Sequence, residues 1–155
     1  MAGQGTKRGQ GSREARKEAF LPVMRQLVRT YQAFERFDAA PLGQYGLTPP
    51  QADVVFTLGN TPGMTFKELG EKTLITKGTL TGIVDRLEAK KLVRRQASEG
   101  DRRCIRVTLT AKGDTLFQKA FPAHVAYLKP RFDRLGPAGL RQAREVLERI
   151  ESLFE

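Results

Sequence analysis

The sequence predicts a mainly helical fold that carries one small β-hairpin, and three observations lead to this prediction. Apolar residues recur at spacings of three and four in several segments, as they do along one face of an α-helix. Between residues 104 and 109 the period changes to two, which is typical of a strand buried on one face. Helix-capping signals divide the helical part into three short helices in the middle and longer helices at both ends.

Composition favours one compact domain in the cytoplasm. The chain has 155 residues and 39% apolar content, enough for one core. It contains neither a signal-peptide pattern nor an apolar run of about 18 residues. Cys104 and His124 are its single cysteine and histidine, which is too few for a disulfide framework or a conventional zinc cluster. We therefore expect no metal and no cofactor.

Charge and motif content point to binding rather than to catalysis. With 27 Lys and Arg against 17 Asp and Glu, the net charge of +10 favours a polyanionic partner, either nucleic acid or an anionic membrane. We find no nucleophile paired with a base, no carboxylate pair and no phosphate-binding loop. No catalytic residue is predicted, and the chain is not expected to be an enzyme.

The N-terminal part is predicted to be a tail followed by a long helix. Residues 1–12 contain almost no bulky apolar side chain, so we expect a disordered basic tail there. Residues 13–40 are predicted to be helical, with Pro22 marking a kink or a late start. The apolar stripe of this helix consists of Phe20, Met24, Leu27, Tyr31 and Phe34.

Residues 47–110 have the signals of a winged helix-turn-helix. Capping residues open three short helices in succession, at Thr48, at Thr65 and at Thr76. A two- or three-stranded β wing follows them, and its second strand alternates apolar with polar residues. The strands of its hairpin are expected at Leu92–Ala97 and Cys104–Leu109. The apolar residues expected on the buried face of the second strand are Ile105, Val107 and Leu109.

The helix that begins at Thr76 has the pattern of a DNA-recognition helix. Apolar residues at spacings of three, four and seven from Leu80 commit one face to the core. The opposite face contains Gly78 and Gly82, and a glycine inside a helix costs up to about 1 kcal/mol relative to alanine. Close approach of the helix to a groove floor would explain this cost, and an ordinary surface helix is the alternative. The candidate DNA-binding residues here are Thr76, Lys77, Gly78, Thr79, Thr81, Gly82 and Arg86.

The hairpin is rich in arginine. Arginine suits contact with a narrow minor groove or bidentate binding of phosphate. Asp101 can hold a neighbouring arginine in one rotamer through a charge-assisted hydrogen bond. A solvated cationic surface is the alternative interpretation. The candidate DNA-binding residues of the wing are Arg94, Arg95, Asp101, Arg102 and Arg103.

Residues 111–155 are predicted to be helices that hold two copies of the chain together. Pro122 and Pro130 are expected to kink or break the first of them, and Gly136 opens the last. Apolar stripes at both ends of the chain fit a homodimer, with packing inside one chain as the alternative. The candidate dimerisation residues are Phe20, Met24, Leu27, Leu140, Leu147, Ile150 and Phe154.

This order of elements resembles the multiple-antibiotic-resistance regulator (MarR) family of bacterial repressors over roughly residues 14 to 155. Three sets of residues carry the resemblance, and one of them, Leu47-Thr48 with Gln51, is similar to the family's entry to the next helix. The run similar to the family's wing and the start of the next helix is Asp101-Arg102-Arg103, followed by Val107, Leu109-Thr110 and Gly113. The run similar to the end of its recognition helix is Asp85-Arg86-Leu87-Glu88, followed by Leu92-Val93.

The resemblance implies a homodimeric repressor that binds a palindromic operator. The helix from Thr76 would read the major groove, and Arg102 or its neighbour would contact the minor groove. Release by a small aromatic or phenolic ligand is also implied, and cysteine oxidation in some family members makes Cys104 a candidate redox site. The residues considered for the ligand pocket are Arg25, Tyr31, Phe34 and His124. The alternative function is a winged-helix module that binds protein or binds nucleic acid without sequence preference.

Overall fold

The computed structural model describes the backbone of residues 5–98 and 100–155. It also describes the side chains of these residues, except those of residues 5–9, 77, 98, 101 and 102. Contacts within the chain divide it into two compact units, Met1–Asp38 and Ala39–Glu155. Among the described residues, no helix combines the length and the apolar content needed to cross a membrane.

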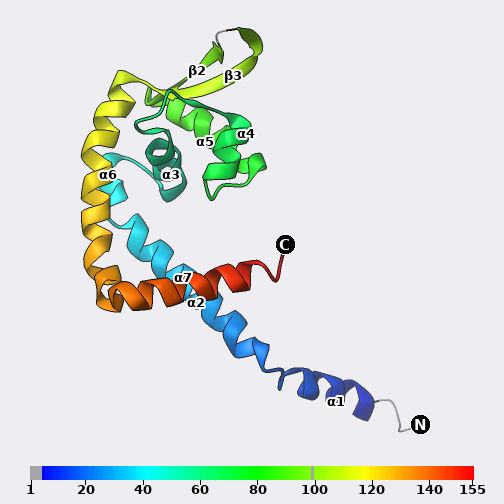
Figure 1. Ribbon diagram of the computed structural model, residues 1–155. Helices are drawn as coiled ribbons and strands as arrows, with labels where there is room; N and C mark the ends of the chain where they lie inside the picture. Colours follow the sequence, from blue (N-terminus) through cyan, green and yellow to red (C-terminus); the bar gives the residue numbers. More distant parts are fainter. Residues whose placement is uncertain (1–4, 99) are drawn as a thin grey trace. The chain divides into compact units, whose positions relative to one another are not determined.

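The N-terminal unit consists of two helices, α1 (Gly5–Ala15) and the greater part of α2 (Phe20–Ala39) (Figure 1). Residues 5–12 are therefore helical and not the disordered tail expected, while residues 1–4 lie outside the described part. The side chains of residues 10–15 are exposed. Pro22 lies in the first turn of α2, where a missing backbone N–H costs little, and this is the late start that the sequence predicted.

Three short helices form the centre of the second unit, after a 3₁₀ helix, η1 (Leu42–Tyr45). They are α3 (Pro49–Leu58), α4 (Phe66–Lys72) and α5 (Lys77–Ala89). The capping signals in the sequence predicted these starts. The Thr65 N–H donates to Glu68 Oε2 at 2.7 Å, and the Glu68 N–H donates to Thr65 Oγ1 at 3.2 Å. The Thr65 N–H stabilises the ionised carboxylate and so lowers the pKa of Glu68.

A three-stranded antiparallel sheet follows, with strand order β1-β3-β2. Its strands are β1 (Met64–Thr65), β2 (Val93–Ser98) and β3 (Asp101–Leu109). Val107 pairs with Met64 of β1 and is fully buried. Ile105 was expected on the same buried face, yet its side chain is 47% exposed. The reason is that β1 is only two residues long, so the hairpin beyond it extends past the core.

Two helices complete the chain, α6 (Ala111–Phe132) and α7 (Gly136–Glu151), joined by a short 3₁₀ helix, η2 (Asp133–Leu135). The sequence predicted a kink or a break in the first of them, and a break is wrong, because α6 continues through Pro122 and Pro130 (Figure 1). Both prolines are exposed, so water can reach the carbonyl that each one leaves without a donor.

The first turn of α6 is packed tightly against the link between α5 and the wing. A Cβ placed on Gly113 would lie 1.9 Å from the carbonyl oxygen of Leu92, so only glycine fits there. The Thr110 N–H donates to the same oxygen at 3.0 Å, and the Thr110 hydroxyl donates to the Lys91 carbonyl at 2.6 Å. The Lys112 ammonium donates to the Lys90 carbonyl at 3.0 Å. These contacts fix the start of α6 to residues 90–92.

The end of α5 is a Schellman cap built on a lysine. The Leu92 N–H donates to the Leu87 carbonyl at 3.0 Å, and the Lys91 N–H donates to the Glu88 carbonyl at 2.8 Å. Lys91 has φ of 59°, the left-handed conformation that glycine adopts without steric cost and that a residue with a Cβ adopts with strain.

We expect Lys91→Gly to raise the free energy of unfolding by up to about 1 kcal/mol, because it removes this strain and leaves the cap hydrogen bonds in place. Urea unfolding at one fixed protein concentration measures the change. Lys91→Ala keeps a Cβ and should give no such gain, so equal stabilisation by both variants would contradict the argument.

Candidate nucleic-acid interface

Helix α5 has one face in the core and the other in solvent. Its four core-facing apolar residues are buried, as their spacing predicted: Leu80, Ile83, Val84 and Leu87. On the opposite face Gly78 and Gly82 are exposed, and a Cβ at either position would meet no atom within 4 Å. Nothing in the fold therefore requires glycine at these two positions, and the face they leave is unusually flat.

The remaining residues predicted on this outer face are small or lie near its end. Thr76, Thr79, Thr81 and Arg86 are all exposed. The hydroxyls of Thr76 and Thr79 are 3.0 Å apart and share a hydrogen bond across the first turn. The side chain of Lys77, which the sequence also placed here, lies outside the described residues.

The turn between α4 and α5 is held to α3 by a carboxylate that the sequence reading missed. Asp53 Oδ2 accepts a hydrogen bond from the Leu74 N–H at 2.9 Å. Thr73 ends α4 by donating its hydroxyl to the Leu69 carbonyl at 2.6 Å. Asp53 lies 21 positions before Leu74, so no local pattern could have linked the two residues.

Arg95 is the predicted wing residue whose position differs most from the expectation. Its guanidinium forms ion pairs with Asp85 and Glu88 of α5, and its side chain is only 26% exposed. The Arg95 N–H also donates to Glu88 Oε1 at 3.2 Å, and the guanidinium carbon lies 5.5 Å from the ring centroid of Phe66. The hydrogen bond to Asp85 is the main cause that raises the pKa of Arg95. Arg95 thus joins the wing to α5 instead of projecting toward a partner.

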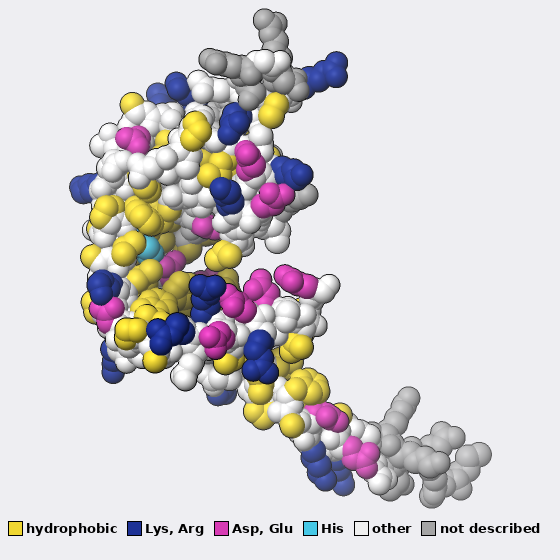
Figure 2. Space-filling model, viewed as in Figure 1, with side chains coloured by type: hydrophobic (Ala, Val, Ile, Leu, Met, Phe, Trp, Pro, Cys, Tyr) yellow, Lys and Arg dark blue, Asp and Glu magenta, His cyan; other side chains and the backbone are white. Residues whose placement is uncertain are grey.

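Two of the other predicted wing residues project into solvent. Arg94 and Arg103 are exposed, and Arg94 Nε donates to Thr108 Oγ1 at 3.4 Å. The side chains of Asp101 and Arg102 lie outside the described residues. In Figure 2, dark-blue Lys and Arg side chains lie beside the grey atoms near the hairpin. The wing therefore adds positive charge next to α5.

Cys104 and Arg106 lie on either side of the exposed Ile105 in β3, and both are partly buried. Arg106 Nη2 donates to the Gly63 carbonyl at 2.8 Å and lies 3.8 Å from Glu68 Oε2. Arg106 is therefore engaged with the loop before β1 and with α4. The redox role considered for Cys104 stays a prediction.

Except for Phe154, which follows the end of α7, the candidate dimerisation residues lie on two helices, α2 and α7, that contain no buried residue. The apolar stripe of each helix is largely in solvent. The exposed members of the predicted set are Phe20, Met24, Leu27, Leu140, Leu147 and Phe154, and Ile150 is half-buried. A stripe this apolar needs a partner surface, which the predicted homodimer would supply.

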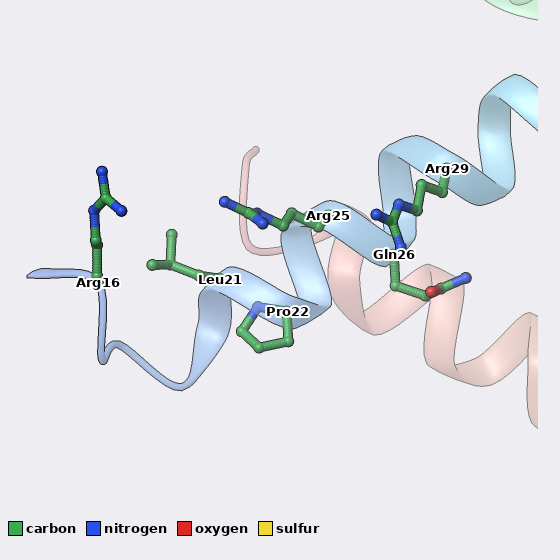
Figure 3. A pocket seen from close by; sticks show the side chains of 6 residues that line it. All are labelled: Arg16, Leu21, Pro22, Arg25, Gln26 and Arg29. Atoms are coloured by element: carbon green, nitrogen blue, oxygen red, sulfur yellow. The ribbon is translucent and has the colours of Figure 1, made fainter.

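The residues considered for a ligand pocket lie in both units. Tyr31 and Phe34 are exposed on α2, and Arg25 lines an open depression of about 630 Å³ (Figure 3). The full lining of this depression is Arg16, Leu21, Pro22, Arg25, Gln26 and Arg29. His124 is buried on α6, where its ring centroid is 5.6 Å from that of Phe56. The pocket itself stays a prediction. No group of three or more His, Cys, Asp or Glu residues that could hold a metal occurs in the described part of the chain.

We expect Arg95→Met to loosen the hairpin from α5 while it keeps an apolar contact with Phe66. Because Asp85 and Glu88 are substantially exposed, the free energy of unfolding should fall by no more than about 1 kcal/mol. Amide hydrogen exchange in β2 should become faster. Arg94→Met, on the exposed side of the same strand, is the matched control. Equal exchange rates in the two variants would show that the ion pairs of Arg95 do not order the wing.

Comparison with known proteins places this arrangement in a family. A family model described as the MarR family matches residues 45–103, which include α3, α4, α5, β2 and the start of β3. The HTH-type transcriptional regulator MhqR of Bacillus subtilis is 29% identical over 133 residues, which are 86% of this chain and 92% of MhqR.

Solved structures extend the likeness to the flanking helices. AbsC, a MarR family transcriptional regulator from Streptomyces coelicolor, matches with a TM-score of 0.75 and 28% identity over 84% of this chain and 90% of AbsC. BpsR of Bordetella bronchiseptica, whose DNA binding is regulated by 6-hydroxynicotinic acid, matches with a TM-score of 0.75 and 25% identity over 86% of this chain and 96% of BpsR. Sequence and fold agree: residues 45–103 match the MarR family of winged helix-turn-helix, DNA-binding transcriptional regulators, and the fold is that of its solved member AbsC.

Proposed function

We propose that this regulator is a homodimeric repressor that binds palindromic operator DNA and is released by a small aromatic ligand. The observation that carries the DNA-binding part is the outer face of α5, which is open, flat and next to a cationic hairpin. An α-helix fits the major groove of B-DNA, and glycines on the facing side let its backbone approach the base edges closely. A protein that acts on the genome in this way works in the cytoplasm.

The wing supplies the second contact in this proposal. Arg94 and Arg103 are exposed on the hairpin, and Arg102 stands at its tip in the sequence. Arginine inserts into a narrow minor groove and binds phosphates in a bidentate manner. Arg95 is left out of the proposed contact because Asp85 and Glu88 already bind its guanidinium. Residues on α5 would then bind in the major groove, and the wing arginines would bind in the adjacent minor groove.

A homodimer is proposed because a palindrome needs two readers about one helical turn of DNA, or about 34 Å, apart. The apolar stripes of α2 and α7 are the surfaces available for this contact. Both helices lack buried residues, and the side chains along the stripes include Phe20, Met24 and Leu147. Burial of these stripes against a second copy would remove apolar area from water and so drive association.

A small aromatic ligand is proposed as the releasing signal. The relative BpsR supports this proposal, since 6-hydroxynicotinic acid regulates its DNA binding. In this chain Arg25 could pair with a carboxylate, while Tyr31 and Phe34 of the same helix could contact an aromatic ring. Addition of 6-hydroxynicotinate or another aromatic acid should lower operator affinity in the titration below, and an unchanged affinity across such acids would remove this part of the proposal.

We expect the protein to bind DNA from upstream of its own gene about a thousandfold more tightly than a scrambled duplex, in the range of specific regulators. Titration of fluorescent duplexes at about 0.15 M salt measures this ratio. Equal, weak binding to every duplex tested would favour the alternative, a module that binds nucleic acid without sequence preference or binds protein.

Arg102→Ala should weaken binding to operator and scrambled DNA alike, because a phosphate or minor-groove cation contributes mainly through charge. The slope of log affinity against log salt concentration should become shallower by about one unit. Lys119→Ala, which removes an exposed charge from α6, is the control. Unchanged affinity for Arg102→Ala would exclude the wing contact.

Leu147→Glu should convert the homodimer into monomers and lower operator affinity, because it places a charge in the apolar stripe of α7. Sedimentation velocity measures the oligomeric state, and circular dichroism verifies the fold. Arg141→Glu adds acidic charge to a different face of the same helix and should leave the dimer intact. A dimer that persists in Leu147→Glu would exclude this surface as the interface.

A further inference from the structure

Leu74 is the most exposed large apolar side chain of the described winged helix-turn-helix. Its exposure is 96%, and the other exposed large apolar residue among the described residues of 47–110 is Ile105. Neighbouring apolar residues are much less exposed to solvent, since Leu69 is fully buried and Ile75 is partly buried against the core. An apolar side chain left in water raises the free energy of the folded protein unless a partner covers it.

The backbone around Leu74 holds this side chain outward. The Leu74 N–H is bound to Asp53 Oδ2 at 2.9 Å. On one side, the Thr73 N–H donates to the Leu69 carbonyl at 2.9 Å. On the other side, Thr76 begins α5 two residues later. Leu74 is therefore presented from a turn whose backbone is held by hydrogen bonds just before α5.

The outer face of α5 offers few groups that read base edges by hydrogen bonding. Adenine is usually read by Asn or Gln and guanine by Arg or Lys. The described outer face carries neither Asn nor Gln, and its arginine, Arg86, lies in the last turn. In the first turn the Thr76 and Thr79 hydroxyls are bonded to each other. Apolar contact is a further way to distinguish bases near the start of α5, beside the candidate reader Lys77, and the major-groove group that accepts it is the C5-methyl group of thymine.

We propose that Leu74 is a specificity-determining residue that packs against thymine C5-methyl groups in the major groove of the operator. The inference rests on the proposed function, because it requires α5 to enter that groove. Gly78, four residues further on, leaves space for the helix backbone to come close to the groove floor. The methyl groups would cover the apolar surface that the fold leaves in water, so the same contact provides affinity and preference for A·T pairs.

Replacement of thymine by uracil tests the contact, because it removes one methyl group and leaves base pairing unchanged. The probe is the operator duplex, with each thymine of one half-site replaced in turn. Wild-type protein should lose about fourfold in affinity for each contacted methyl group, the value expected for one buried carbon. Leu74→Ala should bind the thymine operator more weakly and should show no further loss with uracil at that position.

Ile105→Ala is the matched control, since it removes another exposed apolar side chain from the same region. It should keep the full penalty for uracil. Circular dichroism should show that both variants fold, because each side chain is exposed. This comparison separates a direct contact from a general loss of affinity.

The outcomes separate the inference from the function on which it rests. If wild-type protein prefers the operator over scrambled DNA but binds thymine and uracil duplexes equally, the inference is wrong and the proposed function stands. If Leu74→Ala keeps the full uracil penalty, another residue reads the methyl group and the inference is again wrong. If wild-type protein has no preference for the operator, the proposed function fails and the inference fails with it.

Discussion

Burial of one face of α5 is the constraint on which the interface depends. Its four core-facing side chains are at most 3% exposed to solvent: Leu80, Ile83, Val84 and Leu87. Because they fix the rotation of the helix about its axis, they also fix which residues face solvent. A one-residue rotation would turn the surface about 100° and bury an exposed threonine or glycine face. The flat outer surface is thus a consequence of core packing, and it would be lost with any change that let α5 turn.

The wing is positioned by a second set of contacts that run to the same helix. Arg95 reaches back from β2 to Asp85 and Glu88 and lies over Phe66 of α4. Each ion pair alone is worth little at a surface, yet together they restrict one arginine to one geometry. The hairpin is therefore joined to α5 by one arginine that contacts both α5 and α4.

Sequence reasoning predicted features that depend on neighbours along the chain. The Thr65 and Glu68 caps, the core face of α5 and the late start at Pro22 all have local signals. Sequence reasoning failed where residues far apart in the sequence come into contact. The engagement of Arg95 with α5 could not be distinguished from a free cation, and the short β1 strand, which leaves Ile105 exposed, has no pattern of its own. The break considered at Pro122 and Pro130 does not occur, because the exposed carbonyl that each proline leaves without a donor can bind water.

Because Gly113 has no Cβ, the start of α6 lies in direct contact with residue 92, and α6 can act as a lever on it. Its first turn touches the Leu92 carbonyl with no intervening space, and Thr110 and Lys112 bind the same short link. A helix of 22 residues is about 33 Å long. A tilt of about 5° around its far end would displace the near end by about 3 Å, the length of a hydrogen bond. Such a tilt would carry residues 90–92 with it, so a displacement of α6 would reach both α5 and the wing through this link.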